Sequence, residues 1–153
     1  MELQIRRWEP ADHDTVWELN NHALDIVGAN PGESMFADLH DVQGAYYDKG
    51  GEFLIGTCDG EIVAMGAFKR TADDSVELTR MRIHPDHQRK GYGQAILSAL
   101  ESRAREMGYA RMHLETTVQQ TAAQGLYARN GFVQTGTGTY EDFKLLIYEK
   151  PLQ

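Results

Sequence analysis

Six residues from Gln88 to Gly93 (QRKGYG) combine two cations with two closely spaced glycines. They stand between a strand-like run and an amphipathic helical pattern, so we expect them at the start of a helix. Free N–H groups at a helix start attract negative charge, and glycines let the backbone approach phosphate oxygens closely. Arg89 and Lys90 add positive charge at the rim, although the net charge of the chain is -8. The segment therefore predicts a bound anion.

Two familiar phosphate loops do not fit this segment. A P-loop ends in Gly-Lys-Ser/Thr, whereas Lys90 precedes its glycine. A dinucleotide fingerprint requires a third glycine three residues after Gly93, where this chain has Ile96. What remains is a glycine loop that joins a strand directly to an amphipathic helix.

The elements that position this loop follow from hydrophobic periodicity and turn residues. Strands are expected over residues 3–9, 52–58, 61–68, 76–83, 110–117, 132–136 and 143–150, and helices over 10–27, 34–48, 93–107 and 121–130. No internal repeat or linker-like segment interrupts this sequence. The order β-α-α-β-β-β-α-β-α-β-β predicts one α/β domain over residues 1–153, with a mixed sheet whose faces are covered by helices.

The strand just before the loop contains an irregularity. Val76 and Leu78 stand at even positions, whereas Met81 and Ile83 stand at odd positions. In a regular strand the two pairs would therefore point to opposite faces of the sheet. Either an extra residue at position 79 or 80 forms a β-bulge, or the strand is central and buried on both faces. The sequence leaves both interpretations open. A bulge would turn backbone N–H groups out of the strand ladder next to the glycine loop.

Composition excludes several classes of partner. The chain has 15 Lys+Arg against 23 Asp+Glu, which argues against a nucleic-acid partner. No run of about 18 apolar residues exists, and the first ten residues lack the apolar core of a secretory signal. The single cysteine, Cys58, excludes an internal disulfide framework and suits a reducing compartment. We therefore expect a soluble, cytoplasmic protein with no membrane or nucleic-acid partner.

Two segments of the chain resemble the signatures of a known family. HQRKGYGQAIL resembles the pyrophosphate-binding motif of the GNAT-type N-acetyltransferases, Gln/Arg-x-x-Gly-x-Gly/Ala. LYARNGF, with Ala123 before it, resembles the second signature of that family, Ala-x-x-Leu-Tyr-x-x-x-Gly-Phe. The expected order of elements also resembles the GNAT fold, a single mixed, mostly antiparallel sheet flanked by about four helices.

The resemblance implies that the anion is the pyrophosphate of coenzyme A, with acetyl-CoA as co-substrate and no metal. The residues implied in binding it are Met81, Arg82 and Ile83 along the pantetheine arm, and Gln88, Arg89, Lys90, Gly91, Tyr92 and Gly93 around the pyrophosphate. Gln120 stands where many relatives carry an asparagine that contacts the cofactor arm. Its amide is one methylene longer, so that contact is expected to shift or to be lost.

Acetyl transfer to an amine requires a base, because the amine is an ammonium at neutral pH. Glu77 is the first candidate, since it lies on the strand expected to flank the acetyl group and matches the base of the histone-acetylating branch of the family. Glu115 matches the base of the ribosomal-protein acetyltransferases, and a water chain is a third candidate. Either carboxylate could instead form an ion pair, with Arg80 or Arg82 as partner.

Tyr127 matches the general acid of the family. Its hydroxyl can protonate the departing thiolate if it lies within hydrogen-bond reach. A tyrosine packed under the sheet is the alternative interpretation. The oxyanion is expected to be held by a backbone N–H near Met81. His84 and His87 have only Asp86 nearby, which is thin evidence for a metal site.

The sequence leaves the acceptor open. Its candidate walls are Phe36, Tyr46, Tyr47 and Tyr140, and its candidate ammonium partners are Glu33, Asp38, Asp41, Glu141 and Asp142. Such a mixture favours a small cationic amine or amino compound as acetyl acceptor. The alternatives are a protein N-terminus or lysine, and a non-catalytic coenzyme-A-binding sensor domain. The apolar strand at 143–150 suggests pairing of two chains in a homodimer.

Overall fold

The computed structural model describes residues 2–152. Its strands are β1 (Gln4–Arg7), β2 (Glu52–Cys58), β3 (Glu61–Ala72), β4 (Ser75–Ile83), β5 (Arg111–Thr117), β6 (Val133–Tyr140) and β7 (Phe143–Pro151). Its α-helices are α1 (His13–Ile26), α2 (Val42–Ala45), α3 (Tyr92–Glu106) and α4 (Thr121–Arg129). Short 3-10 helices cover Pro10–Asp12, Glu33–His40, Tyr47–Lys49 and Pro85–His87. The predicted order of elements is confirmed, although the second helical segment is broken into short turns.

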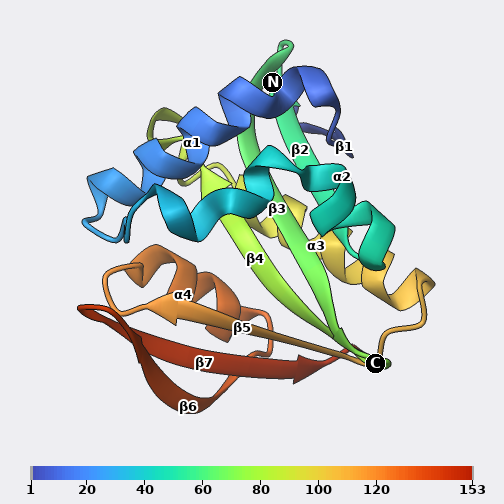
Figure 1. Ribbon diagram of the computed structural model, residues 1–153, viewed down its shortest axis with the longest axis vertical. Helices are drawn as coiled ribbons and strands as arrows, with labels where there is room; N and C mark the ends of the chain where they lie inside the picture. Colours follow the sequence, from blue (N-terminus) through green and yellow to red (C-terminus); the bar gives the residue numbers. More distant parts are fainter. Residues whose placement is uncertain (1, 153) are drawn as a thin grey trace.

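The strands form one sheet in the order β1-β2-β3-β4-β5-β7-β6, in which only β4 and β5 are parallel. Figure 1 shows β5, β7 and β6 turning away from the direction of β2, β3 and β4. The prediction of a mixed, mostly antiparallel sheet is confirmed. The interpretation of residues 143–150 as a pairing edge is wrong, because β7 uses both of its edges within the chain, against β5 and β6.

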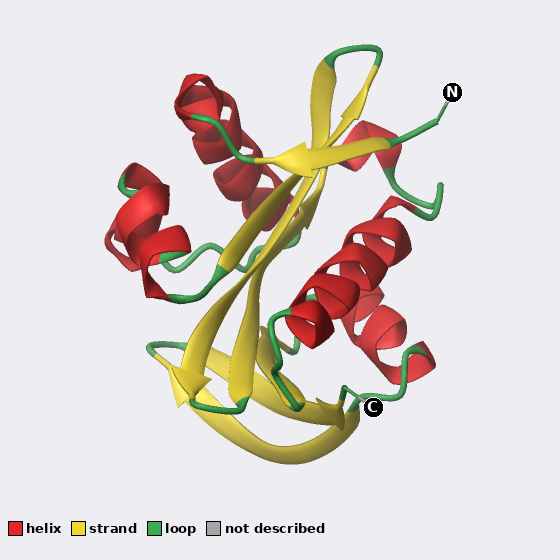
Figure 2. Ribbon diagram, turned by 90° about the vertical axis from the view of Figure 1, so that its right-hand side faces the viewer, coloured by secondary structure: helices red, strands yellow, loops and turns green. Residues whose placement is uncertain are grey.

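Helices cover both faces of the sheet (Figure 2). On one face, α1 and the 33–49 segment pack on β2 and β3 around Val16, Phe36, Tyr46 and Phe53. On the other face, α3 and α4 enclose a second core that includes Leu100. Alternate residues of β2 and β3 point into the two cores, as a strand period of two requires. No helix among residues 2–152 is long and apolar enough to cross a membrane.

The bulge that the parity of β4 suggested is present. Two steps on β3, from Ala67 to Met65, are matched by three steps on β4, from Thr79 to Arg82. Arg80 takes up the extra residue with a left-handed φ of 58°. The apolar residues on both sides of the bulge therefore pack in the same core: Val76, Leu78, Met81 and Ile83.

Gly66 lies opposite the bulge and lets α3 approach the sheet. A Cβ at this position would lie 2.6 Å from Cγ2 of Ile96 and 2.6 Å from Sδ of Met81. These distances are far shorter than the separation of roughly 3.5–4.0 Å that non-bonded carbon atoms prefer, so a side chain at this position would force its neighbours to shift. The bulge and the helix that carries the glycine loop are thus held together through one small residue.

Candidate active site

A cleft opens where β4 and β5 separate. The two strands pair only from Ser75 with Arg111 to Leu78 with Leu114, and beyond this point β5 continues to pair with β7. Within residues 2–152, the edge of β4 that faces β5 therefore has no strand partner after Leu78. The cavity at this place has a volume of about 120 Å³. It is lined by Leu24, Ala29, Pro31, Met35, Phe36, Glu77, Leu78, Thr79, Arg80, Met81, Arg82, Glu115, Thr116, Thr117, Gln120, Tyr127, Tyr140, Phe143 and Leu145.

The bulge is held by an ion pair that crosses from β4 to the 33–40 helix. Nη2 of Arg80 lies 2.7 Å from Oδ1 of Asp38, and its Nε lies 3.1 Å from Oδ2. The hydroxyl of Tyr46 donates to the same carboxylate at 2.5 Å. Burial alone would raise the pKa of Asp38, but the hydrogen bonds and charge of Arg80 and the Tyr46 hydroxyl hold it below its usual value. This arrangement fixes a left-handed arginine at the centre of the cleft.

Glu77 and Glu115 line the cleft from neighbouring strands, and neither forms an ion pair with any residue in 2–152. The pKa of Glu77 is raised, mainly by burial and further by the charge of Glu115, against the opposing effects of His113, Lys69 and Arg80. The suggested ion pair with Arg80 is absent because that guanidinium is committed to Asp38. A carboxylate with a raised pKa in a cleft has the properties of a general base.

Tyr127 lies on α4 with only 5% of its surface exposed, yet it reaches the cleft. Its ring packs against Phe132 and Tyr148 at centroid distances of 5.6 and 6.4 Å. Its hydroxyl has no hydrogen-bond partner among the described residues. Burial raises the pKa of this phenol to about 12, against a smaller opposing effect of Arg82. The phenol is therefore protonated at neutral pH and can act as an acid.

Arg82 is a second arginine in the cleft, and it is not neutralised in the same way. Its Nε donates to Oδ1 of Asn20 at 3.0 Å, and its Nη1 donates to the carbonyl of Met81 at 2.9 Å. No carboxylate among residues 2–152 pairs with it. Burial, and then the charge of Arg80, lower the pKa of this guanidinium to about 10.

The glycine loop lies at the end of β4, as predicted. Gly91 caps α3 with a left-handed φ of 81°, and a Cβ there would meet nothing within 4 Å. Arg89 is also left-handed, and the first intrahelical hydrogen bond is donated only by Ala95. The preceding N–H groups of the helix are left for a ligand or water. Gly93 serves another purpose, because a Cβ there would lie 3.4 Å from Leu126 of α4.

Loop residues 88–91 are exposed, whereas Tyr92 is partly buried and its hydroxyl accepts a hydrogen bond from Cys58 at 3.2 Å. The side-chain oxygen of Gln120, before α4, accepts from the N–H and hydroxyl of Thr117 at 3.1 and 3.0 Å. Only the NH₂ group of this amide is then free to contact a ligand. The predicted binding residues thus lie along one path, from β4 through the loop to the start of α4.

Thr116 is a cleft residue to which the sequence did not point. Its side chain lines the cleft with 4% exposure, and its Oγ1 has no hydrogen-bond partner among the described residues. A buried hydroxyl without a partner is costly, and a polar group of a bound molecule would remove this cost. The alternation of β5 places this residue on the inner face, but nothing in the sequence shows that the neighbouring strand ends beside it.

Several predicted acceptor residues lie elsewhere. Tyr47 hydrogen-bonds the backbone of Trp8 and Phe53 in the core, and Asp41 caps α2. Asp38 is committed to Arg80, so it is not a free ammonium partner. The predicted residues that do line the cleft are Phe36 and Tyr140.

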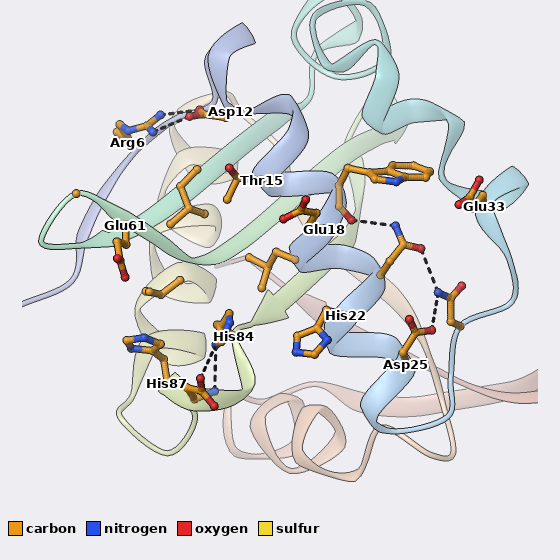
Figure 3. A pocket seen from close by; sticks show the side chains of 18 of the residues that line it. Arg6, Asp12, Thr15, Glu18, His22, Asp25, Glu33, Glu61, His84 and His87 are labelled. Carbon is orange, nitrogen blue, oxygen red and sulfur yellow. Dashed lines mark hydrogen bonds and ion pairs between the residues drawn. The ribbon is translucent and has the colours of Figure 1, made fainter.

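A larger cavity of about 1170 Å³ lies between α1, the β2–β3 turn and the 84–87 loop. Figure 3 shows His22 of α1 in this cavity together with His84 and His87, and acidic side chains such as Glu18 and Asp25 around it. Within residues 2–152, no group of three or more histidine, cysteine, aspartate or glutamate side chains is arranged to hold a metal ion. This cavity contains none of the predicted catalytic residues, so the smaller cleft is the candidate active site.

Comparison with known proteins agrees with this geometry. The family model described as "Acetyltransferase (GNAT) family" matches residues 4–132. Among curated proteins, the chain is 32% identical to IAA acetyltransferase of Azospirillum brasilense over 103 residues, which cover 65% of this chain and 67% of that protein. It is 27% identical to N-acetyltransferase 8F1 of Rattus norvegicus over 121 residues, 76% of this chain and 55% of the relative. The chain thus spans only about half the length of the rat protein.

Solved structures show the same fold. A GNAT acetyltransferase of Staphylococcus aureus Mu50 superposes with a TM-score of 0.93 at 18% identity, covering 99% of this chain and all of that one. The protein yncA of Salmonella typhimurium, whose structure contains acetyl-CoA as its cofactor, superposes with a TM-score of 0.81 at 24% identity, covering 100% and 95%. The matching family model covers most of the chain, so the prediction of an acetyltransferase enzyme is confirmed at the level of the family. This chain belongs to the GNAT family of acetyltransferases.

Proposed function

We propose that this protein transfers the acetyl group of acetyl-CoA directly to the primary amine of a small molecule. The observation that carries the proposal is the unpaired edge of β4 beyond Leu78, which leads from the bulge into the glycine loop. An extended ligand arm can pair with this edge as a further strand would, through the backbone of Met81, Arg82 and Ile83. Its anionic end then reaches the positive loop and the free N–H groups of α3.

The residues of the cleft divide the chemistry between them. Bound acetyl-CoA supplies the acetyl group as a thioester. Glu77 takes a proton from the ammonium, directly or through water, and a backbone N–H near Met81 stabilises the oxyanion. The phenol of Tyr127 holds a proton at neutral pH and gives it to the leaving thiolate. The carbon–nitrogen bond forms first and gives the oxyanion, and the carbon–sulfur bond breaks when the oxyanion collapses, so no covalent enzyme intermediate is required.

A small acceptor fits the cleft better than a protein segment does. The cavity beside the bulge is only about 120 Å³, and it is enclosed by the 29–36 segment and the β6–β7 turn. Unpaired carboxylates at Glu77 and Glu115 suit an ammonium group. A panel of small amines and of peptides, assayed for release of free coenzyme A, distinguishes the two acceptor classes. Binding of acetyl-CoA without release by any acceptor of either class would favour a binding domain without transfer.

Calorimetric titration with acetyl-CoA tests the proposal. The wild-type protein should bind, and Gly91→Glu should lose binding because it adds a side chain and a negative charge at the loop. Gly60→Glu is the matched control, since Gly60 has a φ of 83° and a Cβ there would also meet nothing within 4 Å, but it lies in the β2–β3 turn. Wild-type protein that does not bind would refute the function. Equal binding by Gly91→Glu would refute the position of the pyrophosphate.

A cytoplasmic location and a homodimer stay predictions. The buried single cysteine, Cys58, suits a reducing compartment. Because β7 is an inner strand, a dimer through the sheet would have to use β1 or β6, which are the outer strands. Light scattering of the purified protein measures the number of chains in the particle.

A further inference from the structure

We propose that the acceptor carries a carboxylate beside its amine, as an α-amino acid does, and that the side chain of Arg82 binds this carboxylate. The inference rests on the proposed acetyl transfer and adds the class of acceptor to it. It also assigns to the Arg82 side chain a role that is separate from the role of its backbone along the cofactor arm.

Arg82 has unused binding capacity. A guanidinium has five N–H donors in a planar fork that matches a carboxylate. Here Nε is bonded to Asn20 and Nη1 to the carbonyl of Met81, while Nη2 has no hydrogen-bond partner among residues 2–152. Arg82 nevertheless lines the cleft. A largely buried cation without a partner is costly, so it is retained where a ligand supplies the missing charge.

The charges of the cleft point to the same acceptor. Asp38 neutralises Arg80 through two hydrogen bonds. Among the charged residues that line the cleft, those without an ion pair to any residue in 2–152 are Glu77, Glu115 and Arg82. Along β4, Glu77 and Arg82 lie on opposite sides of the bulge. An acceptor with both an ammonium and a carboxylate complements this pattern, whereas a simple amine leaves Arg82 unpaired.

Asn20 holds the guanidinium of Arg82 in position before a ligand binds. It is fully buried on α1, and its Oδ1 holds Nε of Arg82 at 3.0 Å while its own Nδ2 has no partner among the described residues. A neutral amide positions the guanidinium without cancelling its charge, which an aspartate at the same place would do. The cleft also has apolar walls, which include Leu24, Met35 and Phe36, so an apolar side chain on the acceptor is favoured.

Steady-state assays with acetyl-CoA and matched acceptors test the inference. The probes are L-leucine and L-phenylalanine, their carboxamides, and the two amines that lack the carboxylate. In the wild-type protein, kcat/KM for the amino acid should exceed that for the matching amine by roughly 10- to 100-fold, as expected for a hydrogen-bonded charge pair. Arg82→Gln should lower this ratio by a similar factor, and Arg82→Lys should retain part of it. Asn20→Ala should lower the ratio as well, because the guanidinium loses its support.

Arg105→Gln is the control, since Arg105 lies on α3 and bonds the carbonyl of Leu152, away from the cleft. In Arg105→Gln, the ratio of kcat/KM for the amino acid to kcat/KM for the matching amine should equal the wild-type ratio. A wild-type preference for the amines or carboxamides would overturn the inference without any variant. The inference would also be overturned if Arg82→Gln lowered kcat/KM equally for the amino acid and for the matching amine. That result would mean that the side chain of Arg82 binds the cofactor instead. Failure of the proposed acetyl transfer can be told apart from failure of this inference, because acetyl-CoA would then not bind and no acceptor would react.

Discussion

At the scale of single residues, the cleft depends on two arginines, of which one has its charge neutralised by a carboxylate and the other does not. Arg80 is neutralised by Asp38 and shapes the backbone, whereas Arg82 is held by a neutral amide and keeps its charge available. Strained backbone conformations such as the left-handed Arg80 persist only where their surroundings enforce them. The carboxylate of Asp38 and the hydroxyl of Tyr46 provide that enforcement.

Asp38→Asn should reduce the free energy of unfolding by about 3 kcal/mol at pH 7, because it leaves a buried arginine without its counter-charge. The pKa of Asp38 is lower in the folded state than in the unfolded state, so the ionised carboxylate stabilises the fold. This stabilisation is fully present above the unfolded pKa of about 3.9, and it is lost as the pH falls through the folded pKa. Urea denaturation of both proteins should therefore show the difference shrinking below about pH 4. A difference that is the same well below the folded pKa and at neutral pH would contradict the ionic role of Asp38.

Glu77→Gln should lower kcat/KM by about 10²- to 10⁴-fold if Glu77 is the base. Burial raises the pKa of Glu77, so the acidic limb of the wild-type profile of kcat/KM against pH should lie above the value of about 4.3 for an ordinary glutamate. Glu115→Gln removes a neighbouring negative charge and should move that limb to lower pH while activity is retained. The opposite result, with activity lost in Glu115→Gln alone, would assign the base to Glu115.

Tyr127→Phe should leave the dissociation constant of acetyl-CoA within a few-fold of its wild-type value and lower kcat by about 10²-fold or more. The hydroxyl that is removed has no partner among residues 2–152, so folding should not depend on it. Titration calorimetry and steady-state kinetics on the same preparation measure both quantities. Unchanged kcat would exclude Tyr127 as the acid.

At the scale of elements, the bulge, Gly66 and α3 form one unit. Gly66→Ala should destabilise the fold by about 1–3 kcal/mol, because its Cβ would overlap Ile96 and Met81. Gly138→Ala in β6 is the matched control, since its nearest atoms lie at 4.0 Å. Urea denaturation midpoints compare the two variants. Equal midpoints for Gly66→Ala and the wild-type protein would show that α3 can move away at little cost.

Elements were predictable from the sequence where the signal is local. Alternation along 52–83 and the Asp59–Gly60 turn identified β2, β3 and β4, and the parity change in β4 pointed to the bulge. Pairings between distant segments were not predictable in this way. The contact of Asp38 with Arg80 joins residues 42 positions apart, and periodicity carries no information about such a contact. For the same reason the sequence does not reveal that Asp38 is paired with Arg80 or that β7 is an inner strand.

At the scale of the whole molecule, the sheet consists of two parts that pair over a short stretch, while α3 of the first part also packs against the second part. One part contains β1 to β4 with α1 to α3, and the other contains β5 to β7 with α4 (Figure 1). Among the described residues, the strands of the two parts pair only where residues 75–78 run parallel to 111–114. The proposed ligand path continues from this pairing, since it runs along β4 and ends between the starts of α3 and α4. A ligand bound there contacts both parts.

Acetyl-CoA should therefore stabilise the molecule as a whole. At a free concentration of about 100 times its dissociation constant, linkage predicts about 2.7 kcal/mol of added stability, and a chain of this size should then melt roughly 5–10 °C higher. Hydrogen exchange should slow in the 88–93 loop and in β4 after Leu78, where the edge that faces the cleft has no strand partner among the described residues. Gly91→Glu should show neither effect. A rise in melting temperature without slower exchange along β4 would mean that acetyl-CoA binds elsewhere, because a ligand paired with that edge must protect its amides.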